Sequence, residues 1–187
     1  MKNRNQSQSN LFKLVFAGVT GAIICIATAI FVIPLPTGGY VNLGDCFVML
    51  SGYLLGAVYG SLAGGIGAGI ADLFLGYGIY APFTFVIKSL MAIAVCKITA
   101  LASKRSEKVQ LVAMLVATLT AELIMVSGYF LTELCLYGFE GALANVLGNA
   151  VQGLFGCVSA VAIYTFLAKS KLSDKIRDIL CCKINHI

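Results

Sequence analysis

The sequence is short of charge. Only 11% of its 187 residues are charged, whereas 59% are hydrophobic and the mean hydropathy is +0.94. Soluble domains carry roughly a quarter charged residues, so this composition excludes an ordinary water-soluble protein. Lipid is the solvent that suits such a chain, and the length fits one compact bundle without a second domain.

Histidine is scarce and the motifs of several enzyme classes are missing. The single His lies one residue from the end, and none of the seven cysteines belongs to a C-x-x-C pair. This spacing argues against a zinc site or a disulfide framework. The sequence also lacks a P-loop, a G-x-S-x-G run and an H-E-x-x-H run, which carry nucleotide, acyl-transfer and metalloprotease chemistry. We therefore expect no enzyme, no bound metal and no cofactor.

Long apolar runs are what the sequence does contain. A helix needs about 20 apolar residues to cross a bilayer, and clusters of glycine, proline or charge end each run. The middle part, residues 11–170, is predicted to be an all-α membrane protein, a six-transmembrane-helix bundle. A disordered cytoplasmic N-terminus (1–10) precedes it and a cytoplasmic basic tail (171–187) follows it. The expected helices, of which the second and third form a tight hairpin, cover residues 14–33, 43–56, 60–75, 82–101, 109–132 and 143–168.

Basic residues orient this bundle. Twelve of the thirteen Lys and Arg residues precede the first helix, lie near the end of the fourth or in its connection to the fifth, or follow the sixth. Positive loops stay in the cytoplasm, so the pattern predicts that both ends of the chain are inside (N-in/C-in). The net charge of +5 is explained by this topology, and we expect no nucleic-acid partner. The exception is Lys88, inside the fourth predicted helix.

Small residues recur at intervals of four, a spacing that lets helix backbones approach closely in lipid. Two such files, which begin at Gly52 and Ala57, favour packing within the chain. Another pair of files near the start of the first helix offers a smooth face, which is suited equally to internal packing or to a second subunit. That face consists of Ala17, Gly18, Gly21 and Ala22.

Polar and ionisable side chains fall in the outer half of the predicted spans. Such groups are costly in lipid and usually face a cavity or a partner, and several share a helix face at intervals of 4 or 7 residues. Together they predict an outward-facing polar pocket for a small polar molecule. The alternative is purely structural, namely a buried ion pair of Lys88 with Glu122 or Asp72 and hydrogen bonds between helices. The residues are Tyr40, Asn42, Asp45, Asp72, Lys88, Glu122, Tyr129, Glu133, Asn145, Asn149 and Gln152.

Several runs resemble the substrate-binding S components of energy-coupling factor (ECF) transporters, and more narrowly the riboflavin-transporter-type family. The resemblance covers roughly residues 12–168 and is most specific between 40 and 88. The runs are YVNLGD at 40–45, LLGAVYG at 54–60, AGGIG at 63–67, AD at 71–72, YAPFTFVIK at 80–88 and GNAVQG at 148–153.

This resemblance implies a function and partners. Members capture a water-soluble vitamin or precursor from outside, such as riboflavin, hydroxymethylpyrimidine or pyridoxine. They associate with a transmembrane coupling subunit and two cytoplasmic ATPase subunits, which alone use ATP, in the plasma membrane of bacteria. It places the coupling subunit against Ala17, Gly18, Gly21 and Ala22. It places substrate contacts at Tyr40, Asn42, Lys88, Glu122, Tyr129, Asn145, Asn149 and Gln152.

Two other functions remain open from the residues alone. The chain could be a stand-alone secondary carrier or facilitator, in which Lys88 and Glu122 relay a proton or ion. It could also be a membrane scaffold protein without a ligand, in which the polar stripes only hold helices together.

Overall fold

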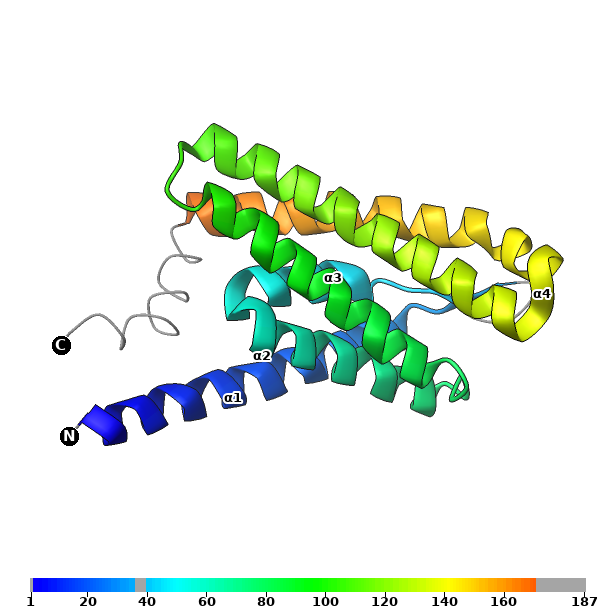
Figure 1. Ribbon diagram of the computed structural model, residues 1–187, viewed down its shortest axis with the longest axis horizontal. Coiled ribbons are helices and arrows are strands. Elements are labelled where there is room, and N and C mark those ends of the chain that lie inside the picture. Colours follow the sequence, from blue (N-terminus) through cyan, green and yellow to red (C-terminus); the bar gives the residue numbers. More distant parts are fainter. Residues whose placement is uncertain (1, 36–39, 171–187) are drawn as a thin grey trace.

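The computed structural model describes residues 2–35 and 40–170 (Figure 1). In this part of the chain, four helices are long and apolar enough to cross a membrane. The only described strands, β1 (Ile33–Pro34) and β2 (Tyr40–Val41), pair antiparallel. The protein is thus an all-α membrane protein, as predicted. The helices are α1 (Lys2–Ile30), α2 (Gly44–Phe74), α3 (Ala81–Ala102) and α4 (Glu107–Lys169).

Both long helices, α2 and α4, double back at a single glycine. Gly56 has φ 82° and ψ −178°, and Gly138 has φ 77° and ψ −178°. Positive φ is open to glycine and strained for other residues. In α2 the two arms touch, since Ser51 Oγ donates to the Gly60 carbonyl over 2.9 Å. Figure 1 shows the reversal of α4 where its yellow segment bends.

These reversals refine the expected hairpins. The predicted connections between the second and third helices and between the fifth and sixth helices shrink to Gly56 and Gly138, because helix continues up to each glycine and resumes right after it. In lipid, backbone N–H and C=O groups need hydrogen-bond partners within the chain. A turn of one residue leaves few of these groups without such a partner.

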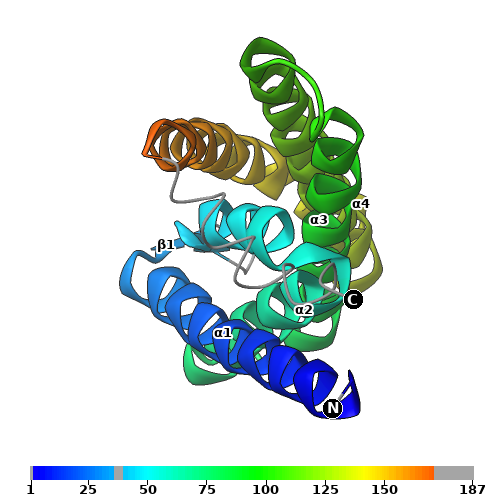
Figure 2. The same cartoon turned by 90° about the vertical axis from the view of Figure 1, so that its left-hand side faces the viewer.

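The first arm of α2 lies in the centre of the bundle, with α1, α3 and both arms of α4 around it (Figure 2). Val48 and Met49 on this arm are fully buried. Close backbone contact fixes its position: a Cβ at Gly52 would lie 2.1 Å from the Ala92 carbonyl oxygen of α3. The Gly52 file therefore packs within the chain, as predicted.

Helix α1 presents its small residues to two different sides. Ala17 is buried, and Gly21 lies 3.4 Å, measured from an ideal Cβ, from the Ala63 carbonyl of α2. Gly18 has open space around it, and Ala22 is exposed. Only the Gly18–Ala22 side thus faces away from the bundle.

The ends of the chain depart from the expectation or lie outside it. Helix α1 begins at Lys2, although disorder was predicted for residues 1–10. No proline or glycine occurs before Gly18, so nothing in the sequence stops the apolar helix from extending towards the N-terminus. The predicted basic tail, 171–187, lies outside the described residues.

The two ends of the bundle differ in chemistry. The start of α1, the α3–α4 connection and the end of α4 lie on the left in Figure 1, and the α2–α3 connection and the α4 reversal lie on the right. Lys104, Arg105, Lys108 and Lys169 belong to the left end, which we call the basic end. The buried polar side chains of the next section lie towards the other end.

Candidate functional site

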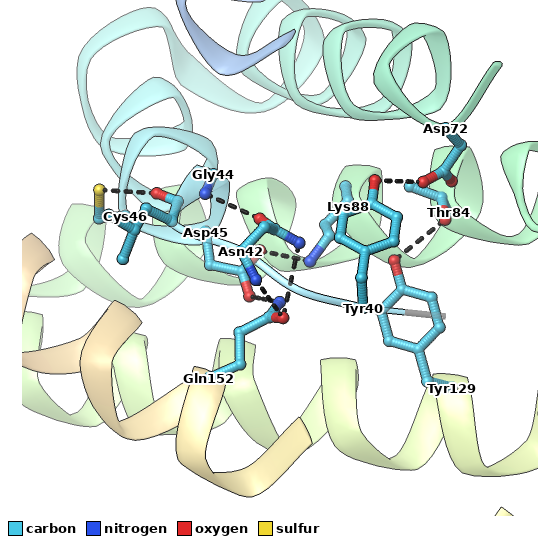
Figure 3. A network of polar contacts seen from close by, with 11 residues as sticks. Tyr40, Asn42, Gly44, Asp45, Cys46, Asp72, Thr84, Lys88, Tyr129 and Gln152 are labelled. Atoms are coloured by element: carbon cyan, nitrogen blue, oxygen red, sulfur yellow. Dashed lines mark hydrogen bonds and ion pairs between the residues drawn. The ribbon is translucent and has the colours of Figure 1, made fainter. Parts of the chain in front are cut away.

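The fold of α2 explains why distant polar residues meet. Because the helix doubles back at Gly56, its first residues and its last residues lie at the same end of the bundle. Asp45 and Asp72 therefore approach the same region, together with the first half of α3 and the middle of both α4 arms (Figure 3). Strand β2 leads Tyr40 and Asn42 into this region and contacts α4.

Asp45 is the centre of a hydrogen-bonded network. It forms an ion pair with Lys88, and the two side chains are 1% and 2% exposed. Its second oxygen accepts a bond of 2.6 Å from Gln152 Nε2. The Gln152 carbonyl oxygen in turn accepts the Asn42 backbone N–H over 2.9 Å. The loop, α2, α3 and α4 are thereby joined through one carboxylate.

The partner of Lys88 is thus neither of the two carboxylates considered from the sequence. Glu122 and Asp72 were the expected partners, but Lys88 binds Asp45. The sequence places all four residues in the outer half of the bundle but does not fix how the helices are rotated, and this rotation decides which charges meet.

Tyrosines form a second group beside this network. Tyr40 donates to Asp72 Oδ1 over 2.5 Å, and the Tyr129 hydroxyl lies 3.0 Å from Thr84 Oγ1. Burial and the neighbouring Asp72 raise the pKa of the Tyr40 phenol, so Tyr40 remains a donor. Lys88 Nζ lies 5.3 Å from the centre of the Tyr129 ring, within cation–π range.

Two further carboxyls are buried on the first arm of α4. Glu133 is 1% exposed. Its Oε1 accepts a hydrogen bond of 2.9 Å from Asn145 Nδ2, and its Oε2 has no hydrogen-bond partner among the residues that the structure describes. Glu122 is 6% exposed, and both of its oxygens lack a partner in the described part of the chain. Buried polar groups without a partner are rare, and each calls for a physical reason.

A small cavity lies among these groups. Its volume is about 20 Å³, room for roughly one water molecule. A solute the size of a vitamin therefore requires the lining to move apart. The lining residues are Leu35, Tyr40, Asn42, Asp72, Tyr80, Thr84, Tyr129, Glu133 and Asn149.

The eight predicted substrate contacts fall into three places. Tyr40, Asn42, Tyr129 and Asn149 line the cavity. Lys88 and Gln152 belong to the Asp45 network. Glu122 and Asn145 are buried on the two arms of α4, outside the lining.

Several residues of the site were absent from those eight contacts. Asp45, Asp72 and Glu133 had been noted as polar groups in the spans but not chosen as contacts. Thr84 and Tyr80 belong to the run 80–88 that resembles the family but were not chosen as contacts either. They precede Lys88 by 4 and 8 residues, a spacing that places them on its helix face.

A larger hollow, about 520 Å³, lies at the basic end, between the start and the end of α4. Tyr53 and Tyr164 line it, with their ring centres 5.1 Å apart, together with Lys108 and Lys169. None of the residues of the Asp45 network lines this hollow.

Comparison with known proteins gives two relatives and one family. The chain is 34% identical over 136 residues to an uncharacterised protein of Pyrococcus woesei, and the aligned part is 72% of this chain and 87% of that protein. It is 25% identical over 170 residues to the thiamine precursor transporter HmpT of Lactococcus lactis subsp. cremoris (strain MG1363). The aligned part is 90% of this chain and 95% of that transporter. The family profile described as "ECF-type riboflavin transporter, S component" matches residues 8–169. Since this match spans most of the chain, the protein belongs to the ECF-type riboflavin transporter S component family.

Proposed function

We propose that this protein captures a water-soluble vitamin or vitamin precursor from outside the cell for ATP-driven uptake by an ECF-type ABC transporter. The family consists of transporter S components, which bind small vitamin-like substrates in the membrane and work with partner ECF modules. The chain is therefore not an enzyme. The identity of its substrate and its coupling to ATPases are parts of the proposal.

The main support is the polar region that five segments share. Side chains from β2, α2, α3 and both arms of α4 meet at the end opposite to the basic end. Keeping four carboxyls and one ammonium buried is costly in a membrane protein. A scaffold could join its helices with fewer charges, whereas a binding site needs unsatisfied groups such as Glu133 Oε2.

We infer six helical segments embedded in the membrane, with the basic end in the cytoplasm. The arms of α4 on either side of Gly138 each rise about 46 Å, enough for one crossing each. The first arm of α2, residues 44–55, rises only about 18 Å, so its turn lies within the bilayer thickness and both ends of α2 face outside. The basic connections at the other end favour the cytoplasm.

The partners of this proposal are a transmembrane coupling subunit and two ATPase subunits. The outward side of α1, with Gly18 and Ala22, supports docking of the coupling subunit, since small residues allow close helix contact in lipid. Ala17 and Gly21 were predicted for the same role, but they pack on α2 instead. There they would hold α1 in place, with Gly18 and Ala22 on its outward side.

The substrates to test first are riboflavin, hydroxymethylpyrimidine and pyridoxine. The similarity to a thiamine precursor transporter favours the pyrimidine. Binding is measured with purified protein in lipid nanodiscs, by native mass spectrometry and by thermal shift. We expect one vitamin or precursor to be retained or to stabilise the protein, and no retained or stabilising compound would contradict the proposal.

Transport by the protein alone separates this proposal from a secondary carrier. In liposomes the chain should bind its substrate but accumulate it only with the coupling and ATPase subunits. A carrier would accumulate it alone under an ion gradient. The proposed relay of such a carrier, Lys88 to Glu122, receives no support here, because Lys88 is paired with Asp45.

A further inference from the structure

The charges around the cavity are strongly one-sided. In the described part of the chain, the buried charged side chains are Lys88 and four carboxyls, those of Asp45, Asp72, Glu122 and Glu133. Lys88 is already neutralised by Asp45. The three remaining carboxyls have no buried cation of their own among the described residues.

Two of these carboxyls line the cavity, and no described Lys, Arg or His does. Asp72 is held by Tyr40 through one oxygen. Glu133 accepts a hydrogen bond from Asn145 through one oxygen, and its other oxygen has no partner within residues 2–35 and 40–170. A buried carboxyl without a cation nearby is kept neutral by protonation. A solute that brings a positive charge or N–H donors is what would hold these groups as carboxylates and pair their free oxygens.

Three tyrosines, Tyr40, Tyr80 and Tyr129, form the aromatic part of the lining. Tyr40 and Tyr77 lie with ring centres 4.8 Å apart, and Tyr80 lies 6.4 Å from Tyr77 and 6.5 Å from Tyr129. Ring faces attract cations and flat rings. Aromatic faces beside carboxylates favour a flat solute that is positively charged or rich in N–H groups.

We propose that the cavity selects a nitrogen heterocycle that carries amino groups or a positive charge, and that it excludes carboxylated or phosphorylated forms. This inference rests on the proposed function and narrows its substrate class. Glu133 accepts from an amino group of the solute, Asp72 adds negative charge, and the tyrosines cover the ring. An anion in this site meets two carboxyls and no Lys, Arg or His among the described lining residues.

The test compares each candidate with its own phosphate ester. Hydroxymethylpyrimidine, pyridoxamine, riboflavin and their phosphate esters are titrated against the protein in nanodiscs by calorimetry. We expect an amino heterocycle to bind most tightly, and each phosphate ester to bind at least about tenfold more weakly than its parent. If riboflavin or a phosphate ester binds most tightly, this inference is wrong while the proposed function stands. If nothing binds, the proposed function itself fails.

Variants then assign the effect to the cavity. Glu133→Gln keeps an acceptor for Asn145 but removes the charge, and we expect it to weaken binding of the amino heterocycle about tenfold or more. The variant should also reduce the difference in affinity between each parent compound and its phosphate ester. Glu140→Gln is the matched control, because Glu140 is exposed near the α4 reversal, and its binding should not change.

Lys108→Met tests the hollow at the basic end, which at about 520 Å³ is large enough for a solute and has Lys108 in its lining. We expect it to leave binding unchanged. If Lys108→Met abolishes binding and Glu133→Gln does not, the solute binds at the basic end and the assignment to this cavity is overturned. A folding defect in Glu133→Gln would appear as loss of the thermal transition without ligand, in which case Asp72→Asn, which keeps an acceptor for Tyr40, replaces it.

Discussion

At the scale of single residues, the ion pair of Lys88 and Asp45 is the contact whose loss we expect to lower the stability of the protein most. Both side chains are almost fully buried. Lys88→Met leaves the Asp45 carboxylate buried without its counter-charge, which typically costs about 3–5 kcal/mol. We expect this loss in chemical unfolding measured in detergent.

The double variant Lys88→Met, Asp45→Asn should recover most of that loss, because it removes both charges and keeps an acceptor for Gln152. Lys97→Met is the control: Lys97 is exposed, and surface substitutions usually change stability by less than about 0.5 kcal/mol. If the single and double variants were equally unstable, the pair would not be the source of the effect.

At the scale of helices, close packing of α2 on α3 depends on Gly52. An added Cβ would lie 2.1 Å from the Ala92 carbonyl oxygen and 2.8 Å from its carbon, both backbone atoms. Since backbone cannot move aside cheaply, Gly52→Ala should separate the two helices and destabilise the protein by about 1–3 kcal/mol or more. Thermal unfolding in detergent measures this.

Gly18→Ala provides the comparison on α1, where nothing lies within 4 Å of the added Cβ. We expect it to raise the stability of the isolated protein slightly, because alanine favours helix. In the assembled transporter the same change should weaken association with the coupling subunit. Unchanged assembly would count against docking on this side of α1.

The sequence predicted most of the helices but not how two of them connect. Apolar runs and their interruptions locate α3 and the arms of α4 within a few residues. The stripe of Asn145, Asn149 and Gln152 is buried, as its spacing of 4 and 7 residues predicts. The connections were expected near Gly56 and Gly138 but as longer turns, because the sequence does not reveal that one residue with a positive φ is enough to reverse the helix.

The site was predicted by region more than by residue. Membrane depth follows from position along a span, so the sequence could locate the polar region near one end. Which side chains touch depends on helix rotation and on where β2 enters. Because both depend on contacts between segments far apart in the sequence, the sequence does not show that Asp45 pairs with Lys88, or that Glu133 rather than Glu122 lines the cavity.

At the scale of the whole molecule, the proposed orientation places the site outside and the basic end in the cytoplasm. Single cysteines introduced into a variant without the seven native cysteines test this in intact cells. Glu140→Cys, near the Gly138 reversal, should react with a membrane-impermeant maleimide from outside. Lys104→Cys, in the α3–α4 connection, should react only after the membrane is permeabilised.

The α2 hairpin makes this test sharper than a simple inside–outside assignment. If α2 crossed the bilayer once as a straight helix, Leu43 and Gly78, at its two ends, would lie on opposite sides. Because α2 doubles back at Gly56, Leu43→Cys and Gly78→Cys should both react from outside. Labelling of only one of them would contradict the hairpin and, with it, the meeting of Asp45 and Asp72 at one end, on which the site depends.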